Sequence, residues 1–185
     1  ETMVQSLEKS AHKTPVSLFE EAVTAANKAV FEESASHVEY EGMGTTVVAC
    51  TLEENTLYIA NIGDSRLYLI RDGIEQITDD HSLVEEMVKQ GNITESEARI
   101  HPQKNIITRA LGINEEVQAD FFEIDVEQGD VIMLCSDGLS NMIEDEDMEY
   151  IVKNSDTLQT AAESLVARAN ENGGNDNITV VLAEV

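Results

Sequence analysis

The chain has 185 residues, which fits a single domain, and 42% of them are hydrophobic, which is enough for a buried core. Its 37 Asp and Glu residues outnumber its 11 Lys and Arg residues, and the net charge of −26 disfavours binding to nucleic acids and to anionic membranes. The sequence has no apolar run long enough to cross a bilayer, and its first residues do not resemble a secretory signal. Cys50 and Cys135 lie inside apolar runs, which favours buried, reduced thiols and a cytoplasmic location.

Apolar residues at helical spacing mark the N-terminal part of the chain. They predict a helix within residues 1–12 and a second helix from about Pro15 to Ser34. Pro15 suits the first position of a helix, where the missing N–H has no intrahelical partner. Ser17 with Glu20 could instead form a capping box that starts the second helix.

From Gly42 onward the apolar pattern changes to that of β-strands. The runs rich in β-branched and apolar residues predict four strands, at residues 45–52, 56–62, 66–70 and 74–78. Arg71-Asp72-Gly73 is a hairpin-turn signal between the last two of them. Because the connections are too short for crossover helices, we expect an antiparallel meander.

The strand pattern is interrupted at about residues 79–112. Ser82 with Glu85, and Thr94 with Glu97, have the spacing of capping boxes, and each pair predicts the start of a short helix. We interpret this segment as a helical insertion between strands and as a candidate lid or recognition flap.

Strands, two helices and a last strand complete the chain. Their predicted bounds are 119–126 and 131–135 for the strands, 145–154 and 158–170 for the helices, and 178–185 for the last strand. This order of elements favours an α+β fold with antiparallel sheets over a parallel α/β fold. Since the sequence has no internal repeat and no linker, residues 1–185 are expected to form a single domain.

Three aspartates stand beside strand-like apolar runs. Asp64 follows the run 57–62, and Asp176 precedes the last strand. Asp137 follows the run 131–135, where we expect the strand to give way to a turn at Asp137-Gly138. A carboxylate at the end of a buried strand needs a partner, and Mg²⁺ or Mn²⁺ prefers such oxygen ligands. Each aspartate taken alone fits a turn or helix-cap residue better. Their shared position at strand ends favours a metal site, where a bound water would become a nucleophile near neutral pH.

Other polar residues have two readings each. Arg66 could bind phosphate, but its place at the start of a strand favours a structural ion pair near the acidic centre. His81 and His101 stand at the two ends of the insertion, where a general acid is possible and helix-boundary packing is favoured. Ser65, Ser136 and Ser140 have no His–acid partner at a recognisable spacing, which argues against a serine nucleophile. The glycine-rich stretch Gly42–Thr46 enters a strand rather than a helix, which argues against a nucleotide-binding loop.

Six short motifs occur in one order along the chain. They are Gly42-Met43-Gly44-Thr45-Thr46, Ile62-Gly63-Asp64-Ser65-Arg66, Asp80-His81-Ser82-Leu83-Val84, Ile107-Thr108-Arg109-Ala110-Leu111-Gly112, Cys135-Ser136-Asp137-Gly138-Leu139 and Asp176-Asn177-Ile178-Thr179. In this order the chain resembles, over nearly its whole length, the bacterial form of the metal-dependent serine/threonine protein phosphatases of type 2C.

The resemblance implies an antiparallel β-sandwich flanked by helix pairs, with two to three Mg²⁺ or Mn²⁺ ions at the sheet ends. It also implies hydrolysis of phosphoserine and phosphothreonine by a metal-activated water, in proteins phosphorylated by a serine/threonine kinase. By motif, Asp137 and Asp176 resemble ligands of the catalytic metal pair, and Asp64 resembles a ligand of a third ion. Residues 81–109 resemble the flap that modulates substrate choice.

The chain departs from the family pattern in two places. The family's first motif, Asp-Gly-Met-Gly-Gly-His, and the arginine-bearing strand before it are absent, so the sequence looks as if it starts just after them and lacks the N-terminal strands. We therefore expect the 185-residue polypeptide alone to be nearly inactive, with fewer metals, and to self-associate through swapped strands. Asn141 stands where many members carry an acid, and its neutral amide is expected to weaken the third metal site.

Two other functions are compatible with the same residues. The first is a non-catalytic, phosphatase-like module that binds phosphoproteins or has a regulatory role. The second is an acidic, metal-binding β-protein that does not act on phosphate.

Overall fold

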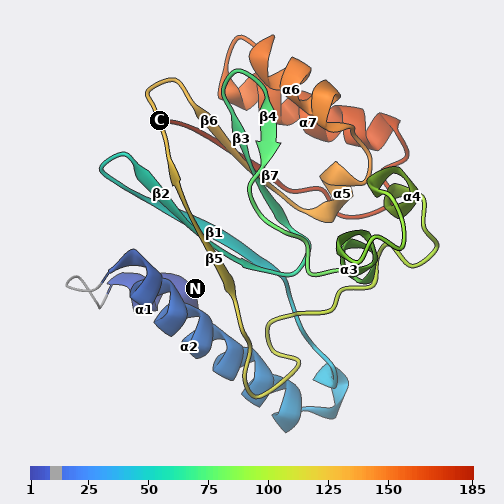
Figure 1. Ribbon diagram of the computed structural model, residues 1–185. Coiled ribbons are helices and arrows are strands. Elements are labelled where there is room, and N and C mark those ends of the chain that lie inside the picture. The colour runs from blue at the N-terminus through green and yellow to red at the C-terminus, as the bar shows by residue number, and fades with distance from the viewer. Residues whose placement is uncertain (9–13) are drawn as a thin grey trace. The chain divides into compact units, whose positions relative to one another are not determined.

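The computed structural model describes residues 1–8 and 14–185, and these divide into two compact units. The first unit contains residues 1–63 and 81–124, and the second contains residues 64–80 and 125–185. Each unit has its own sheet and its own helices (Figure 1). The α+β class with antiparallel sheets is therefore confirmed, whereas the sandwich arrangement of the sheets and the single domain stay predictions.

The sheet of the first unit has three strands in the order β1-β2-β5. Their bounds are Val47–Glu53 for β1, Thr56–Ile62 for β2 and Asp120–Asp125 for β5. β1 and β2 form an antiparallel hairpin in which Val47 lies opposite Ile62. The hairpin brings the end of β2, just before Asp64, beside the start of β1.

The helices of the first unit are α1 (Thr2–Glu8), α2 (Pro15–Ser36) and the short 3₁₀ helix η1 (Val38–Tyr40). The hydroxyl of Thr14 accepts a hydrogen bond from the N–H of Ser17, so α2 starts with Pro15 in its first turn and not at a Ser17 capping box. Residues 9–12 of the first predicted helix lie outside the described residues.

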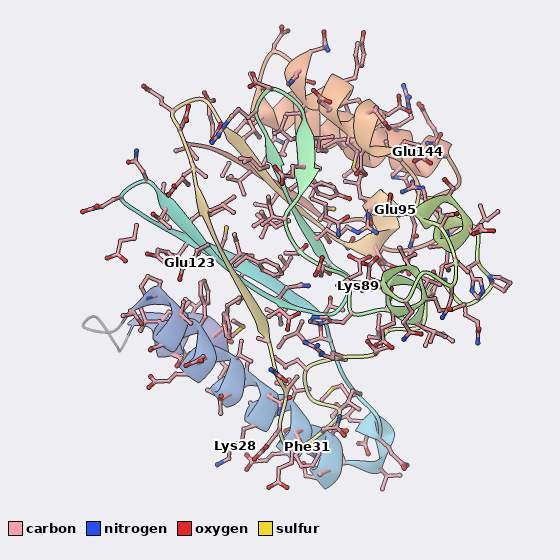
Figure 2. All side chains as sticks on the ribbon, viewed as in Figure 1. Lys28, Phe31, Lys89, Glu95, Glu123 and Glu144 are labelled. Carbon is pink, nitrogen blue, oxygen red and sulfur yellow. The ribbon has the colours of Figure 1, made fainter. Side chains whose placement is uncertain are left out.

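One face of α2 is buried and the other is exposed. The buried residues Val23 and Ala26 pack with Ile62 of β2 and with Leu111 in the core of this unit. Lys28, labelled in Figure 2, lies on the exposed face and forms an exposed ion pair with Glu32 one turn further on. The apolar stripe that the sequence indicates is thus the face that buries α2.

The insertion contains two short helices, as predicted. α3 (Leu83–Lys89) begins at Ser82, whose hydroxyl accepts from the N–H of Glu85, and α4 (Glu95–Arg99) begins with the complete Thr94–Glu97 capping box. Gly91 follows α3 with a φ of +72°, the left-handed conformation that ends many helices.

The second unit is built on a four-stranded antiparallel sheet in the order β4-β3-β6-β7. The strands are β3 (Arg66–Ile70), β4 (Ile74–Gln76), β6 (Val131–Cys135) and β7 (Val180–Glu184). The helices α5 (Asp137–Ser140), α6 (Asp145–Lys153) and α7 (Leu158–Glu171) belong to the same unit. Its core joins sheet and helices through fully buried side chains, namely Tyr68, Met133, Leu139, Met148, Ala161, Leu165 and Ala169.

Two expectations about local structure are wrong. The strands 45–78 do not form one meander, because β2 and β3 belong to different sheets, and the chain changes sheet at Gly63 with a φ of +104°. Asp137-Gly138 is not a turn but the start of α5. Within residues 1–8 and 14–185, no helix has the length and apolar character needed to cross a membrane.

Candidate metal centre

Asp137 and Asp176 are held on neighbouring strand ends of the second unit. β6 pairs with β7, and Asp137 follows β6 while Asp176 precedes β7. Ser136 joins the two segments: its N–H donates to the carbonyl of Thr179 (3.1 Å), and its hydroxyl donates to the carbonyl of Asn177 (3.0 Å) and accepts from the N–H of Thr179 (3.0 Å). The backbone of one aspartate is therefore fixed against the backbone that follows the other.

Gly138 allows this close approach. A Cβ atom at this position would contact the carbonyl oxygen of Asn177 and would lie 2.9 Å from the Asn177 carbonyl carbon and 3.4 Å from that of Asp176. Because these are backbone atoms, they cannot move aside as a flexible side chain would. A side chain at position 138 would thus force the two aspartate-bearing segments apart.

Asp64 is electrostatically coupled to Asp137. Partial burial, followed by the negative charges of Asp137 and Asp80, raises the pKa of Asp64 to about 6, and Arg66 only partly opposes this effect. A carboxylate whose ionised form is disfavoured in this way is stabilised by a nearby cation. Asp176 is more exposed, and its side chain accepts a hydrogen bond from the N–H of Asn177 (2.7 Å).

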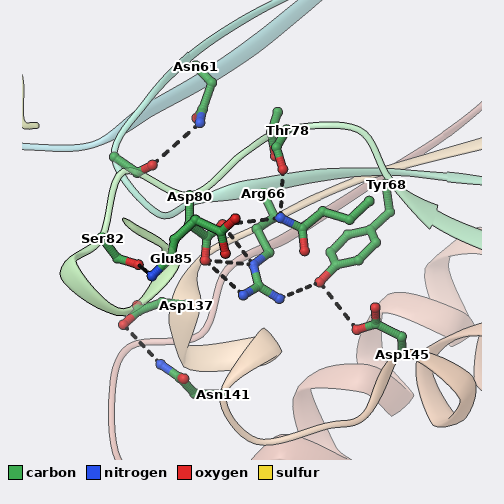
Figure 3. Close-up of polar contacts among 12 residues, drawn as sticks. Asn61, Arg66, Tyr68, Thr78, Asp80, Ser82, Glu85, Asp137, Asn141 and Asp145 are labelled. Carbon is green, nitrogen blue, oxygen red and sulfur yellow. Dashed lines mark hydrogen bonds and ion pairs between the residues drawn. The ribbon is translucent and has the colours of Figure 1, made fainter. Parts of the chain in front are cut away.

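Arg66 is committed to an ion pair, as its position at the start of a strand indicates. Its Nε and Nη2 atoms donate to the carboxylate of Asp80 at 2.8–3.1 Å, and its Nη1 donates to the hydroxyl of Tyr68 at 2.9 Å (Figure 3). Tyr68 in turn donates to Asp145 (3.4 Å). Asp80 and Tyr68 thus orient the guanidinium of Arg66, which lies within electrostatic range of Asp64. The sequence does not indicate this role for Asp80 or for Tyr68.

Asn141 lies next to Asp137. Its side-chain amide N–H donates to Oδ2 of Asp137 at 3.3 Å (Figure 3). An acid at this position would face the Asp137 carboxylate with an oxygen instead of a donor. Asn141 thus contributes a donor, not an oxygen ligand, in this arrangement.

The three predicted ligands are brought together in part. Asp64 lies within electrostatic range of Asp137, and Asp137 lies beside the segment of Asp176. Among the residues that the structure describes, no group of three or more His, Cys, Asp or Glu side chains has the geometry of a metal site. The assignment of Asp64, Asp137 and Asp176 as ligands therefore stays a prediction.

The two histidines of the insertion have different surroundings, both in the first unit. His81 is only 5% exposed, and its ring contacts Gly63, Arg109 and Asp120. His101 is partly exposed, and its Nδ1 accepts from the N–H of Gln103 (3.2 Å). Both arrangements are packing roles of the kind that the sequence favours over a general acid.

Comparison with known proteins agrees with this fold. Residues 1–183 match the family described as protein phosphatase 2C. The chain is 42% identical to the serine/threonine phosphatase stp of Listeria monocytogenes serotype 4b over 166 residues, which are 89% of this chain and 66% of that protein. It is 47% identical to the protein phosphatase PhpP of Streptococcus pneumoniae over 147 residues, which are 79% of this chain and 60% of the relative. The chain thus spans less than two thirds of the length of these relatives.

Solved structures show the same similarity. The serine/threonine phosphatase Stp1 of Staphylococcus aureus superposes with a TM-score of 0.92 at 32% identity, over 100% of this chain and 76% of that one. The catalytic domain of the phosphatase PstP, in complex with two manganese ions, superposes with a TM-score of 0.86 at 34% identity, over 99% of this chain and 78% of that one. The chain belongs to the protein phosphatase 2C family.

Proposed function

We propose that the protein hydrolyses phosphoserine and phosphothreonine in other proteins, with Asp137 and Asp176 as ligands of a catalytic Mn²⁺ or Mg²⁺ pair and Asp64 as a ligand of a further ion. Family membership supports the reaction. The observation that carries the site is the close backbone approach at Gly138, which places Asp137 beside the segment of Asp176. Partial burial, and then the negative charge of Asp137, raise the pKa of the neighbouring Asp64 to about 6. A divalent ion at this position would relieve the repulsion between the carboxylates.

The donor set fits the proposed metal. Asp64, Asp137 and Asp176 offer carboxylate oxygens, which Mg²⁺ and Mn²⁺ prefer, and all three belong to one unit. A bound ion of this kind lowers the pKa of a coordinated water and neutralises charge on a phosphoryl group. The chain's own residues position the ligands: Ser136 ties the two strand ends together, and Gly138 lets them approach.

Arg66 has a positioning role in this proposal. Its guanidinium contacts both oxygens of Asp80 and the hydroxyl of Tyr68, a side chain with no exposed surface. These contacts occupy the N–H donors of the planar guanidinium group, so we propose that Arg66 fixes the start of the strand next to Asp64 and does not bind the phosphate of the substrate.

The proposed partners and location follow from the chemistry. Phosphorylated proteins, modified by a serine/threonine kinase, are the substrates, and nucleic acids are disfavoured by the net charge of −26. The two free cysteines, one buried and one partly buried, suit the reducing cytoplasm that we propose as the location.

The test is phosphate release from phosphoserine and phosphothreonine peptides by the protein expressed from its own gene. We expect activity that requires Mn²⁺ or Mg²⁺, is lost in EDTA and falls at least about 100-fold in Asp137→Asn and Asp176→Asn. Asp156→Asn is the matched control, because Asp156 is an exposed acid of the same unit. Its activity should equal that of the unmodified protein.

Two outcomes would contradict the proposal. Undiminished hydrolysis in EDTA would exclude a metal-dependent reaction. Binding of phosphopeptides without any hydrolysis would support a non-catalytic phosphatase-like module instead.

A further inference from the structure

His81 holds Gly63, the residue before Asp64, from two sides. Its Nδ1 accepts a hydrogen bond from the N–H of Gly63 at 3.0 Å, and its backbone N–H donates to the carbonyl of Gly63 at 2.9 Å. The side-chain amide of Asn61 also donates to that carbonyl, at 3.4 Å. Both peptide groups flanking Gly63 are thereby oriented by side-chain and backbone contacts.

The conformation at Gly63 has little freedom to relax. Its φ of +104° is in the left-handed region, and a Cβ atom there would contact the side chain of Thr46. Asp64 is the next residue, so the orientation of the peptide that leads into it depends on this turn.

The hydrogen bonds determine which ring nitrogen of His81 carries the proton. Because Nδ1 accepts from Gly63, the proton of the neutral ring is on Nε2, which donates to Oδ2 of Asp120 at 3.0 Å. Nη1 of Arg109 lies 3.1 Å from this protonated nitrogen and therefore does not donate to the ring. Arg109 donates to Oδ1 of the same carboxylate at 2.6 Å. Burial alone would raise the pKa of Asp120, but the hydrogen bonds from His81 and Arg109 lower it, so the carboxylate stays ionised and holds the tautomer.

The same histidine closes the base of the insertion. Its carbonyl accepts from the N–H of Thr108 at 2.8 Å, and next to it the N–H of Leu83 donates to the carbonyl of Ile106 at 2.9 Å. Ser82 and Ile107 form an antiparallel bridge between these two contacts. Residues 83–106 therefore form a closed loop, and His81 pairs with Thr108 just outside its two ends.

We propose that His81 is a positioning residue, which fixes the Gly63 turn from the base of the insertion and so sets how Asp64 is presented to a cation. The consequence for Asp64 rests on the proposed function, since it takes Asp64 as a metal ligand. The orientation of Gly63 by the ring rests on the contacts of the first unit alone. A change that loosens the base of the insertion would then alter metal binding at Asp64 without touching the carboxylate.

Two substitutions at His81 distinguish the contribution of Nδ1 from that of Nε2. His81→Asn keeps an acceptor close to the position of Nδ1, whereas His81→Gln keeps a polar group near Nε2 and loses the acceptor for Gly63. His101→Asn is the matched control, because the Nδ1 of His101 also accepts a backbone N–H, that of Gln103, elsewhere in the same unit.

The primary readout is amide hydrogen exchange of Gly63, measured by NMR on the protein expressed from its own gene. We expect exchange about tenfold faster in His81→Gln, the effect of losing one hydrogen bond, and within about threefold of the parent in His81→Asn and His101→Asn. The ¹⁵N shifts of the His81 ring should show an unprotonated Nδ1 and a protonated Nε2. Unchanged exchange of Gly63 in His81→Gln, or a ring protonated at Nδ1, would overturn the inference.

A Mn²⁺ titration by calorimetry measures the consequence for Asp64. His81→Gln should weaken the weakest Mn²⁺ site about tenfold, while His81→Asn restores most of the affinity. Equal Mn²⁺ affinity in the parent and His81→Gln would overturn the proposed link to Asp64. The titration of Asp64→Asn tests the ligand assignment separately: if it leaves Mn²⁺ binding unchanged, the proposed function loses this ligand, while the exchange of Gly63 still decides the role of His81.

Discussion

The substitution Gly138→Ala tests the geometry that brings Asp137 and Asp176 together. Gly138 is buried in α5, directly after Asp137, and it faces the backbone of Asp176 and Asn177. An added methyl group would overlap with the carbonyl oxygen of Asn177, so either α5 or the segment before β7 must shift.

Two opposing effects set the magnitude. Overpacking against atoms that cannot rotate away costs about 1–3 kcal/mol. Alanine in a helix is favoured over glycine by roughly 0.5–1 kcal/mol, which offsets part of that cost. We therefore expect the free energy of unfolding to fall by up to about 2.5 kcal/mol, and the affinity for Mn²⁺ to fall at least about tenfold because Asp137 moves away from Asp176.

Urea unfolding and a Mn²⁺ titration measure the two effects. Gly73→Ala is the matched control: Gly73 lies in the turn between β3 and β4 of the same unit, and a Cβ there would have nothing within 4 Å. This variant should stay within about 0.5 kcal/mol of the parent. A Gly138→Ala variant with unchanged stability and Mn²⁺ affinity would refute the close approach as the reason for glycine.

Three further predictions concern the residues that hold each unit together. The side chain of Asp130 is 3% exposed and accepts two hydrogen bonds from Arg71, which lower the pKa of Asp130. Its ionised form therefore stabilises the fold above about pH 4, and this contribution is lost as the pH falls through the lowered pKa. Asp130→Asn should therefore lose about 2 kcal/mol in urea unfolding at pH 7 and progressively less as the pH falls below about 4, and a pH-independent difference would contradict this reading. A lysine at position 66 lacks the planar guanidinium group that contacts both Asp80 and Tyr68, so Arg66→Lys should lower the free energy of unfolding by about 2 kcal/mol. A change below about 0.5 kcal/mol would refute the role of the guanidinium group. Asn27 is 2% exposed, and its side chain makes three hydrogen bonds to the loop at residues 112–115. Asn27→Ala should therefore lower the free energy of unfolding by about 2–4 kcal/mol in thermal or urea unfolding. An unchanged free energy of unfolding would show that the loop does not depend on Asn27.

Local structure could be predicted from the sequence where a local signal exists. The Thr94–Glu97 capping box and the Arg71–Gly73 hairpin turn both have the predicted form, because each depends on residues that are close in the chain. The bounds of α2 differ from the prediction by two residues at its C-terminal end, where neither a glycine nor a proline marks the stop in the sequence.

Strand partnership could not be predicted in the same way. β2 and β3 follow one another and were expected to pair, yet β2 pairs within one sheet and β3 within the other. Short connections exclude crossover helices but do not decide which strands are neighbours, since that depends on burial across the whole chain. A glycine at position 63 indicates a sharp turn between β2 and β3, but it does not indicate which sheet β3 joins.

The candidate site shows the same division. Placing Asp64, Asp137 and Asp176 at strand ends was possible from the sequence, and the structure couples Asp64 to Asp137. The contacts of His81 with Asp120 and Arg109 join residues 39 and 28 positions apart, so no local pattern reveals them. Reading Asp137-Gly138 as a turn was wrong because glycine there serves a close backbone contact within α5, not a change in chain direction.

The most direct test of the account is a crystal of the protein grown with Mn²⁺ and measured at the manganese absorption edge. Anomalous scattering places the metal without any assumption about activity. We predict a peak within bonding distance of the carboxylates of both Asp137 and Asp176, and a weaker one beside Asp64. Manganese bound only elsewhere on the molecule, or not at all, would contradict the proposed metal centre.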